Sequence, residues 1–152
     1  MKEYLVIGIL IVAIFSSFCL GNQMGKQTQA EAHRQQLQAE CVHTLKSSIE
    51  WFETYAEKPS ESAYWHGVSA FNHFAGTYEV LTLEPPGSVE SVYLIEYLNF
   101  VDTLQDHPTQ CRERMDEIIA LIGMLSEDLE DANTYIKFRS IVENVKDEIQ
   151  TK

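Results

Sequence analysis

The segment YLVIGILIVAIFSSFCL, from Tyr4 to Leu20, constrains the fold of this chain most because it holds no charged residue. As a helix rising about 1.5 Å per residue it would extend roughly 26 Å, slightly less than the hydrocarbon core of a bilayer. It is also longer than the apolar region of about 7–15 residues in a secretion signal. The sequence therefore predicts a transmembrane anchor, or an uncleaved signal, over residues 1–22. A cleaved secretion signal is the alternative.

Small residues recur at every fourth position through this segment and just beyond it. On a helix they would share one face, and small residues allow two membrane helices to approach closely. The pattern predicts a packing stripe through which two copies of the span could form a homodimer, and its members are Ala13, Ser17, Gly21 and Gly25. The alternative interpretation is that the two glycines only mark the exit from the bilayer.

The orientation of the span follows from the basic residues beside it. Lys2 and the amino terminus on one side nearly balance Lys26 and Arg34 on the other, so the positive-inside rule gives little preference. A very short N-terminal head usually stays in the cytoplasm. We therefore expect a single-pass protein of the cell membrane whose remaining domain lies outside the cytoplasm.

The chain beyond the anchor is predicted to be helical throughout. Residues 23–36 are rich in glutamine and strong helix formers, which favours a helical stalk, with low-complexity disorder as the alternative. From residue 37 to residue 152, apolar residues recur every three or four positions, as they do on helices with one buried face. The sequence therefore predicts an all-α fold, in which the anchor and stalk precede an acidic, four- or five-helix up-and-down bundle.

Turn signals divide the predicted bundle into its helices. Proline ends or precedes a helix, and serine, threonine or asparagine can cap its first turn. The apolar helix VYLIEYLNFV, near the middle of the bundle, is predicted to be buried by several neighbours. The fourth and fifth helices could instead be one long bent helix. The predicted caps are Ser60 or Ser62, then Ser88, then Thr109, then Asn133 or Thr134.

Charge limits the classes of partner that this chain could bind. It carries 11 basic and 23 acidic residues, a net charge of −12. Such a chain repels phosphate backbones and anionic head groups, so the sequence predicts neither nucleic-acid binding nor a domain lying on the membrane surface.

Cysteines and histidines are the candidates for covalent or metal chemistry. Cys41 and Cys111 would lie at different levels of a simple up-and-down bundle, so we expect no disulfide between them. A bridge would mean a different order of helices in space. Three histidines could in principle hold zinc, but ordinary surface histidines are the favoured interpretation for His43, His66 and His73.

The sequence predicts no catalytic residue, no metal and no cofactor. It contains no GxSxG, Walker, HExxH or CxxC motif. Glu40 and His43 have the Glu-x-x-His spacing of di-iron bundles, but the sequence has no second such motif to complete a site. We therefore expect a membrane-tethered interaction module that binds a partner protein without catalysis. The alternatives are a small-ligand-binding bundle and, less favoured, a His-dependent metalloprotein. The aromatic residues that could contact a ligand or partner are Trp65, Phe71, Tyr97 and Phe100, although core packing is the favoured role for most large aromatics.

Overall fold

The structure is a computed structural model. It describes the backbone of residues 2–83, 89–129 and 131–150, and the side chains of residues 28–83, 92–129 and 131–149. The chain divides into two compact units, Met1–Gln36 and Leu37–Lys152. The described backbone forms six α-helices, which confirms the predicted all-α bundle: α1 (Lys2–Glu57), α2 (Glu61–Thr82), α3 (Val89–Asp106), α4 (Pro108–Glu113), α5 (Met115–Glu127) and α6 (Ala132–Gln150).

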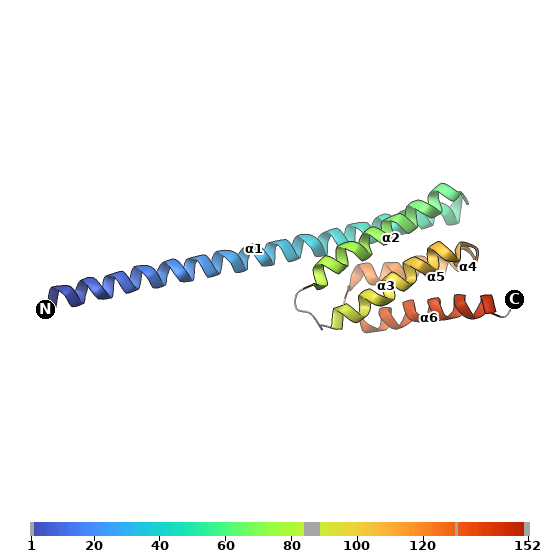
Figure 1. Cartoon of the computed structure of the whole chain (residues 1–152). Helices are drawn as coiled ribbons and strands as arrows, with labels where there is room; N and C mark the ends of the chain where they lie inside the picture. Colours follow the sequence, from blue (N-terminus) through green and yellow to red (C-terminus); the bar gives the residue numbers. More distant parts are fainter. Residues whose placement is uncertain (1, 84–88, 130, 151–152) are drawn as a thin grey trace. The chain divides into compact units, whose positions relative to one another are not determined.

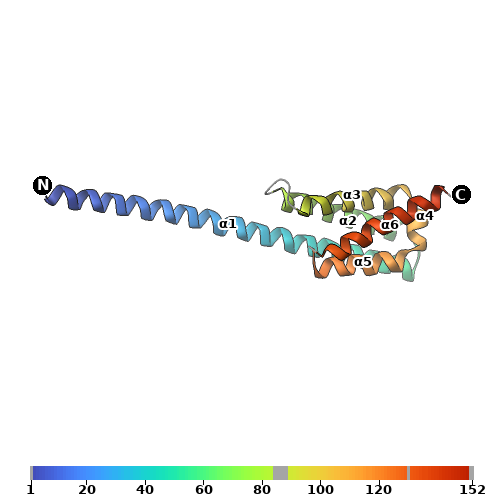
Figure 2. The same cartoon turned by 90° about the horizontal axis from the view of Figure 1, so that it is seen from below.

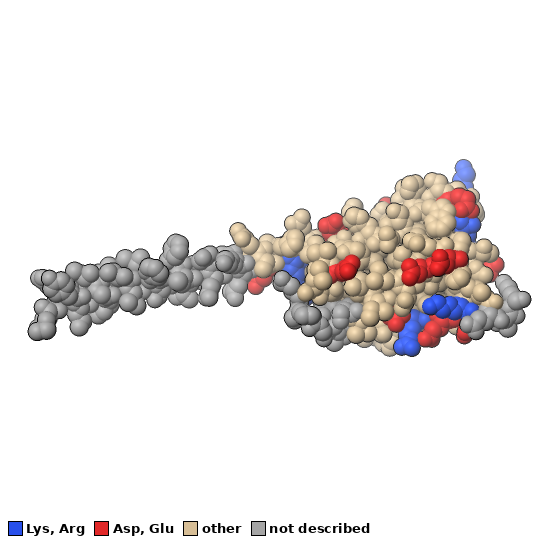
Figure 3. Space-filling model, in the orientation of Figure 1, with Lys and Arg blue, Asp and Glu red and all other residues tan. Residues whose placement is uncertain are grey.

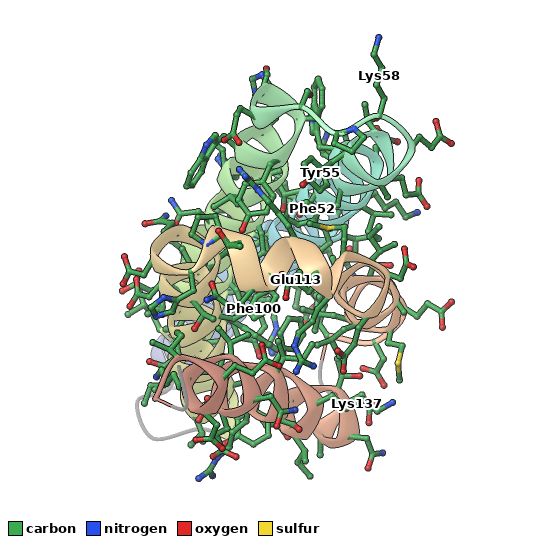
Figure 4. The ribbon with its side chains drawn as sticks, turned by 90° about the vertical axis from the view of Figure 1, so that its right-hand side faces the viewer. Phe52, Tyr55, Lys58, Phe100, Glu113 and Lys137 are labelled. Atoms are coloured by element: carbon green, nitrogen blue, oxygen red, sulfur yellow. The ribbon has the colours of Figure 1, made fainter. Side chains whose placement is uncertain are left out.

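All of the described helices of the second unit contribute side chains to one core. The part of α1 from residue 37 onward packs beside α2. Helix α2 packs beside α3, and α6 lies between α3 and α5 (Figures 1 and 2). Ring contacts of Tyr93 with Tyr135 and of Phe100 with Phe138 show that α3 and α6 run parallel. The short helix α4 crosses one end of this arrangement and connects α3 to α5 (Figure 4).

The core is rich in aromatic side chains. Phe71 contacts Phe100 edge-on, with ring centroids 5.1 Å apart, and both rings contact Phe138 of α6. Seen along the bundle in Figure 4, Phe52 and Phe100 point inward while Lys58 and Lys137 point away. Aromatic pairs contribute about 0.5–1.5 kcal/mol beyond the burial of their area, so this cluster ties α2, α3 and α6 together.

Close approach of α1 and α2 depends on a glycine. A β-carbon at Gly67 would come within 2.5 Å of the Phe52 ring, so no larger residue fits there without a shift. The Ser48 hydroxyl is buried and donates a hydrogen bond of 2.9 Å to the Gly67 carbonyl oxygen. Because this bond satisfies a polar group inside the bundle, the contact fixes the register of the two helices.

The helix boundaries agree only partly with the predicted caps. Ser60 caps α2 as predicted, because its hydroxyl accepts a 3.2 Å hydrogen bond from the N–H of Ala63. The prediction for Thr109 was wrong, since α4 begins one residue earlier at Pro108 and has no side-chain cap. Ser88 lies outside the described residues.

The cap of α6 also differs from the prediction. Asp131, rather than Asn133 or Thr134, caps this helix, because its carboxylate accepts hydrogen bonds from the backbone N–H groups of both of those residues. It also accepts a 2.7 Å bond from the Thr134 hydroxyl. These bonds, led by the one from Thr134, hold the pKa of Asp131 below its usual value.

The number of helices exceeds the prediction because the expected fourth helix is broken at Arg114. This residue leaves helical geometry, with φ of −111° and ψ of 20°, so that α4 and α5 are separate elements. Its guanidinium bonds to Glu148 of α6 and to Glu117 of α5, 3.2 Å away. The break therefore places Arg114 where it can join α5 to α6.

Candidate functional site

The outer side of α3 exposes three aliphatic side chains. Val92, Ile95 and Leu98 are 48%, 58% and 41% exposed, and their spacing of three residues places them along one side of the helix. The opposite side of α3 is buried, through residues such as Tyr97 and Phe100. The prediction that this helix is buried by several neighbours was therefore wrong for one side. We call Val92, Ile95 and Leu98 the α3 face.

Charged side chains surround the α3 face. Figure 3 shows this side of the bundle, where uncharged residues cover most of the surface and the acidic residues form patches that lie apart from one another. Acids outnumber bases on the adjoining parts of the three helices. The acids are Glu79 on α2, Glu96, Asp102 and Asp106 on α3, and Glu143 on α6; the bases are Arg139 and Lys146 on α6.

The two bases on α6 are close to acids. Arg139 bonds to Glu143 at 2.9 Å, and this bond raises the pKa of the guanidinium. Lys146 shares a polar pocket of about 200 Å³ with Asp102 and Asp106. The surroundings of the α3 face therefore stay negative overall.

The four aromatic residues singled out from the sequence do not share one environment. Phe71, Tyr97 and Phe100 are fully buried, and the rings of all three contact Phe138. Trp65 is 42% exposed, contacts Tyr64, and donates a 3.2 Å hydrogen bond to Glu61. Three of the four thus contribute to the core, and Trp65 belongs to a separate cluster.

That cluster is centred on Arg112 of α4, at the end of the bundle. Its guanidinium lies over the Tyr64 ring, 4.5 Å from the centroid, and bonds to Glu61 at 2.6 Å. The bond lowers the pKa of Glu61 and raises that of Arg112. An open pocket of about 490 Å³ lies beside it, lined in part by Tyr55, Arg112 and Arg114. Both arginines already have carboxylate partners, so the cluster joins helices rather than offering an unpaired charge.

The three histidines considered for zinc lie in one groove between α1 and α2. His43, His66 and His73 line a shallow pocket of about 280 Å³. The His66 ring contacts the Trp51 ring in a tilted arrangement, with centroids 4.6 Å apart, and His73 lies 3.3 Å from a carboxylate oxygen of Glu40. Within the described part of the chain, no group of three or more His, Cys, Asp or Glu side chains is placed to hold a metal ion.

The cysteines of the bundle are free and buried. Burial raises the pKa of the Cys41 thiol to about 12 and that of Cys111 to about 11. The Cys111 thiol donates a weak hydrogen bond to the carbonyl oxygen of Thr103, 3.5 Å away. Because only thiolates are good nucleophiles, neither side chain is suited to covalent catalysis.

The predicted packing stripe of Ala13, Ser17, Gly21 and Gly25 lies outside the residues whose side chains are described. Among the residues that could be searched, no helix is both long and apolar enough to cross a membrane. The predicted anchor over residues 1–22 falls outside that search, so it stays a prediction.

The fold and its surface define an all-α bundle with an exposed aliphatic face on one helix. In comparisons with known proteins, no family model, curated protein or solved structure matches this chain. Its function must therefore be argued from its own residues.

Proposed function

We propose that this chain is a membrane-tethered interaction module, in which residues 37–152 form an acidic bundle that binds a partner protein without catalysis. The observation that supports this proposal is the α3 face. Clusters of exposed aliphatic side chains on a folded domain often mark sites of protein contact. The small-ligand alternative has less support, because Phe71, Tyr97 and Phe100 fill the core.

The tether in this proposal is the apolar segment over residues 1–22, followed by a stalk over residues 23–36. It would hold the bundle at the cell membrane through one span, with the bundle outside the cytoplasm. Pairing of spans through Ala13, Ser17, Gly21 and Gly25 would give a homodimer.

Membrane attachment can be tested by fractionating cells that produce the chain with a C-terminal tag. We expect a full-length membrane species whose tag is removed by protease added outside the cytoplasm. A soluble product that has lost the apolar segment would contradict the tether, and a protected tag would contradict the orientation.

The contact surface can be tested with a photo-crosslinking amino acid placed at single positions. We expect one discrete adduct with a partner protein when the crosslinking amino acid stands at Ile95, and likewise when it stands at Leu98. Leu98→Asp should abolish the adduct formed at position 95, and Ile95→Asp should abolish the adduct formed at position 98. Ser140 and Asn144, which are exposed on α6, are matched control positions. Equal adducts from all four positions, or none from α3, would overturn the α3 face as the binding surface.

A further inference from the structure

We propose that the partner segment seated on the α3 face is a basic amphipathic helix. This inference rests on the proposed function, because it names the chemistry of the partner at the same surface. It follows from the geometry of the face, from the charges around it and from the repulsion that a second copy would meet.

The geometry of the α3 face suits a helix. Val92, Ile95 and Leu98 extend about 9 Å along α3, a little less than two helical turns. A partner helix offers apolar side chains at comparable intervals, spaced three, four or seven residues apart. The backbone of α3 is already hydrogen-bonded within its own helix, so the surface offers no open edge to an extended strand.

The charges around the α3 face favour a basic partner. Asp102 follows Leu98 by four residues and Ile95 by seven, so it lies at the end of the same exposed side of the helix. Glu96 flanks the face toward α6, and Glu79 is exposed on the neighbouring helix α2. Lysine or arginine side chains beside the apolar stripe of a partner would meet these carboxylates, which speeds association and selects the partner.

A second copy of the chain is a poorer occupant. Its own α3 face would bring Asp102, Glu96 and Glu79 close to the same carboxylates. The repulsion would add to that between two chains that each carry a net charge of −12. Anionic lipid is disfavoured for the same reason.

The test uses the full chain in nanodiscs of zwitterionic phosphatidylcholine and two fluorescent peptides of about 18 residues, long enough to form helices. Both peptides carry the same leucine stripe; one has lysines beside it and the other has glutamates. Fluorescence anisotropy, with empty nanodiscs as the blank, should show that the lysine peptide binds about tenfold or more tightly. Its affinity should fall as salt rises from about 50 to about 300 mM, because charge attraction is screened.

Variants locate the binding. Ile95→Ser with Leu98→Ser should weaken binding of the lysine peptide about tenfold or more, and Asp102→Asn should weaken it about threefold. Glu53→Gln is the matched control, an exposed acid on α1, and should change nothing. Equal affinity for both peptides, or lysine-peptide binding that survives the double change on α3, would overturn the inference.

These outcomes separate the inference from the proposed function. If Ile95 and Leu98 yield a partner adduct but the face prefers the glutamate peptide, the interaction module stands and the basic partner is wrong. If the crosslinking finds a second copy of this chain at Ile95, the basic partner is also wrong. If neither peptide binds and no adduct forms from α3, both proposals fail.

Discussion

Two glycines in the same helix have opposite surroundings. Gly67 faces the Phe52 ring, whereas a β-carbon at Gly76 would meet no atom within 4 Å. Gly67→Ala should therefore destabilise the bundle by about 1–3 kcal/mol through overpacking. Gly76→Ala should stabilise it by about 0.5–1 kcal/mol, because alanine favours the helix more than glycine does. Urea denaturation followed by circular dichroism measures the free energy of unfolding of both variants. Equal changes in the same direction would contradict the close packing at Gly67.

The carboxylate of Asp131 should make stability depend on acid pH. Its pKa is lowered in the folded chain, first by the bond from Thr134 and then by the backbone bond from Asn133. A lowered folded pKa stabilises the fold above the unfolded value, about 3.9, and this contribution is lost as pH falls through the folded pKa. Asp131→Asn should therefore reduce stability at neutral pH and flatten the decline below about pH 4. The control is Asp116→Asn, which changes an exposed acid on α5. If both variants flatten the dependence of the unfolding free energy on pH equally, that dependence does not come from Asp131.

The buried thiols should react only after the bundle opens. With the pKa of Cys41 near 12 and that of Cys111 near 11, almost no thiolate is present in the folded chain at neutral pH. In a chain carrying Cys19→Ser, iodoacetamide at about pH 8 should label neither remaining cysteine without denaturant and both in urea. Mass spectrometry after digestion reads each site separately. Rapid labelling of either cysteine in the native chain would show that its burial is wrong.

At the scale of the helices, periodicity and local signals predicted most elements correctly. Pro59 and Ser60 gave the boundary between α1 and α2, because both act through the backbone of adjacent residues. The break at Arg114 had no such signal, since neither proline nor glycine is near it. It is stabilised by contact with Glu148, which lies 34 residues further along the chain. A single sequence does not reveal pairs of that separation.

The difference between local signals and contacts of distant residues also explains which site residues could be predicted. A strongly apolar helix such as α3 has the same sequence pattern whether two or three neighbours cover it, so the exposure of Ile95 and Leu98 became visible only in the structure. The periodicity placed Phe71 and Phe100 in the core correctly. Trp65 instead lies at the surface, where its indole donates a hydrogen bond to Glu61 beside the Arg112 cluster.

Arg112 should contribute to stability more by packing than by charge. Its guanidinium lies over Tyr64, while its partner Glu61 is largely exposed and therefore screened. Arg112→Ala should cost about 1–2 kcal/mol, and Arg112→Lys should recover less than half because an ammonium lacks the planar group that stacks. Glu61→Gln should cost less than Arg112→Ala, because the Glu61 carboxylate is exposed and its charge is screened by solvent. Urea denaturation of the three variants measures their free energies of unfolding. A larger decrease for Glu61→Gln than for Arg112→Ala would show that charge, rather than packing, is the main contribution of Arg112.

At the scale of the whole molecule, two opposing forces would act on self-association. The proposed span would attract a second span through its small residues, while the net charge of −12 on each chain would oppose the pairing. Since charges farther apart than the Debye length of about 10 Å at 0.1 M salt are screened, added salt should strengthen any dimer. Dimerisation that weakens with salt would instead indicate pairing through ion pairs.

Substitutions within the span test the attractive part. Ser17→Ile with Gly21→Ile should abolish self-association in a membrane dimerisation assay, because the branched side chains prevent close approach of two helices. Phe15→Ile with Cys19→Ile makes the same number of changes on the opposite side of a helix and should leave self-association intact. If both pairs reduce dimerisation equally, the stripe has no special role. If neither does, the contact between copies lies elsewhere and the prediction of the stripe is wrong.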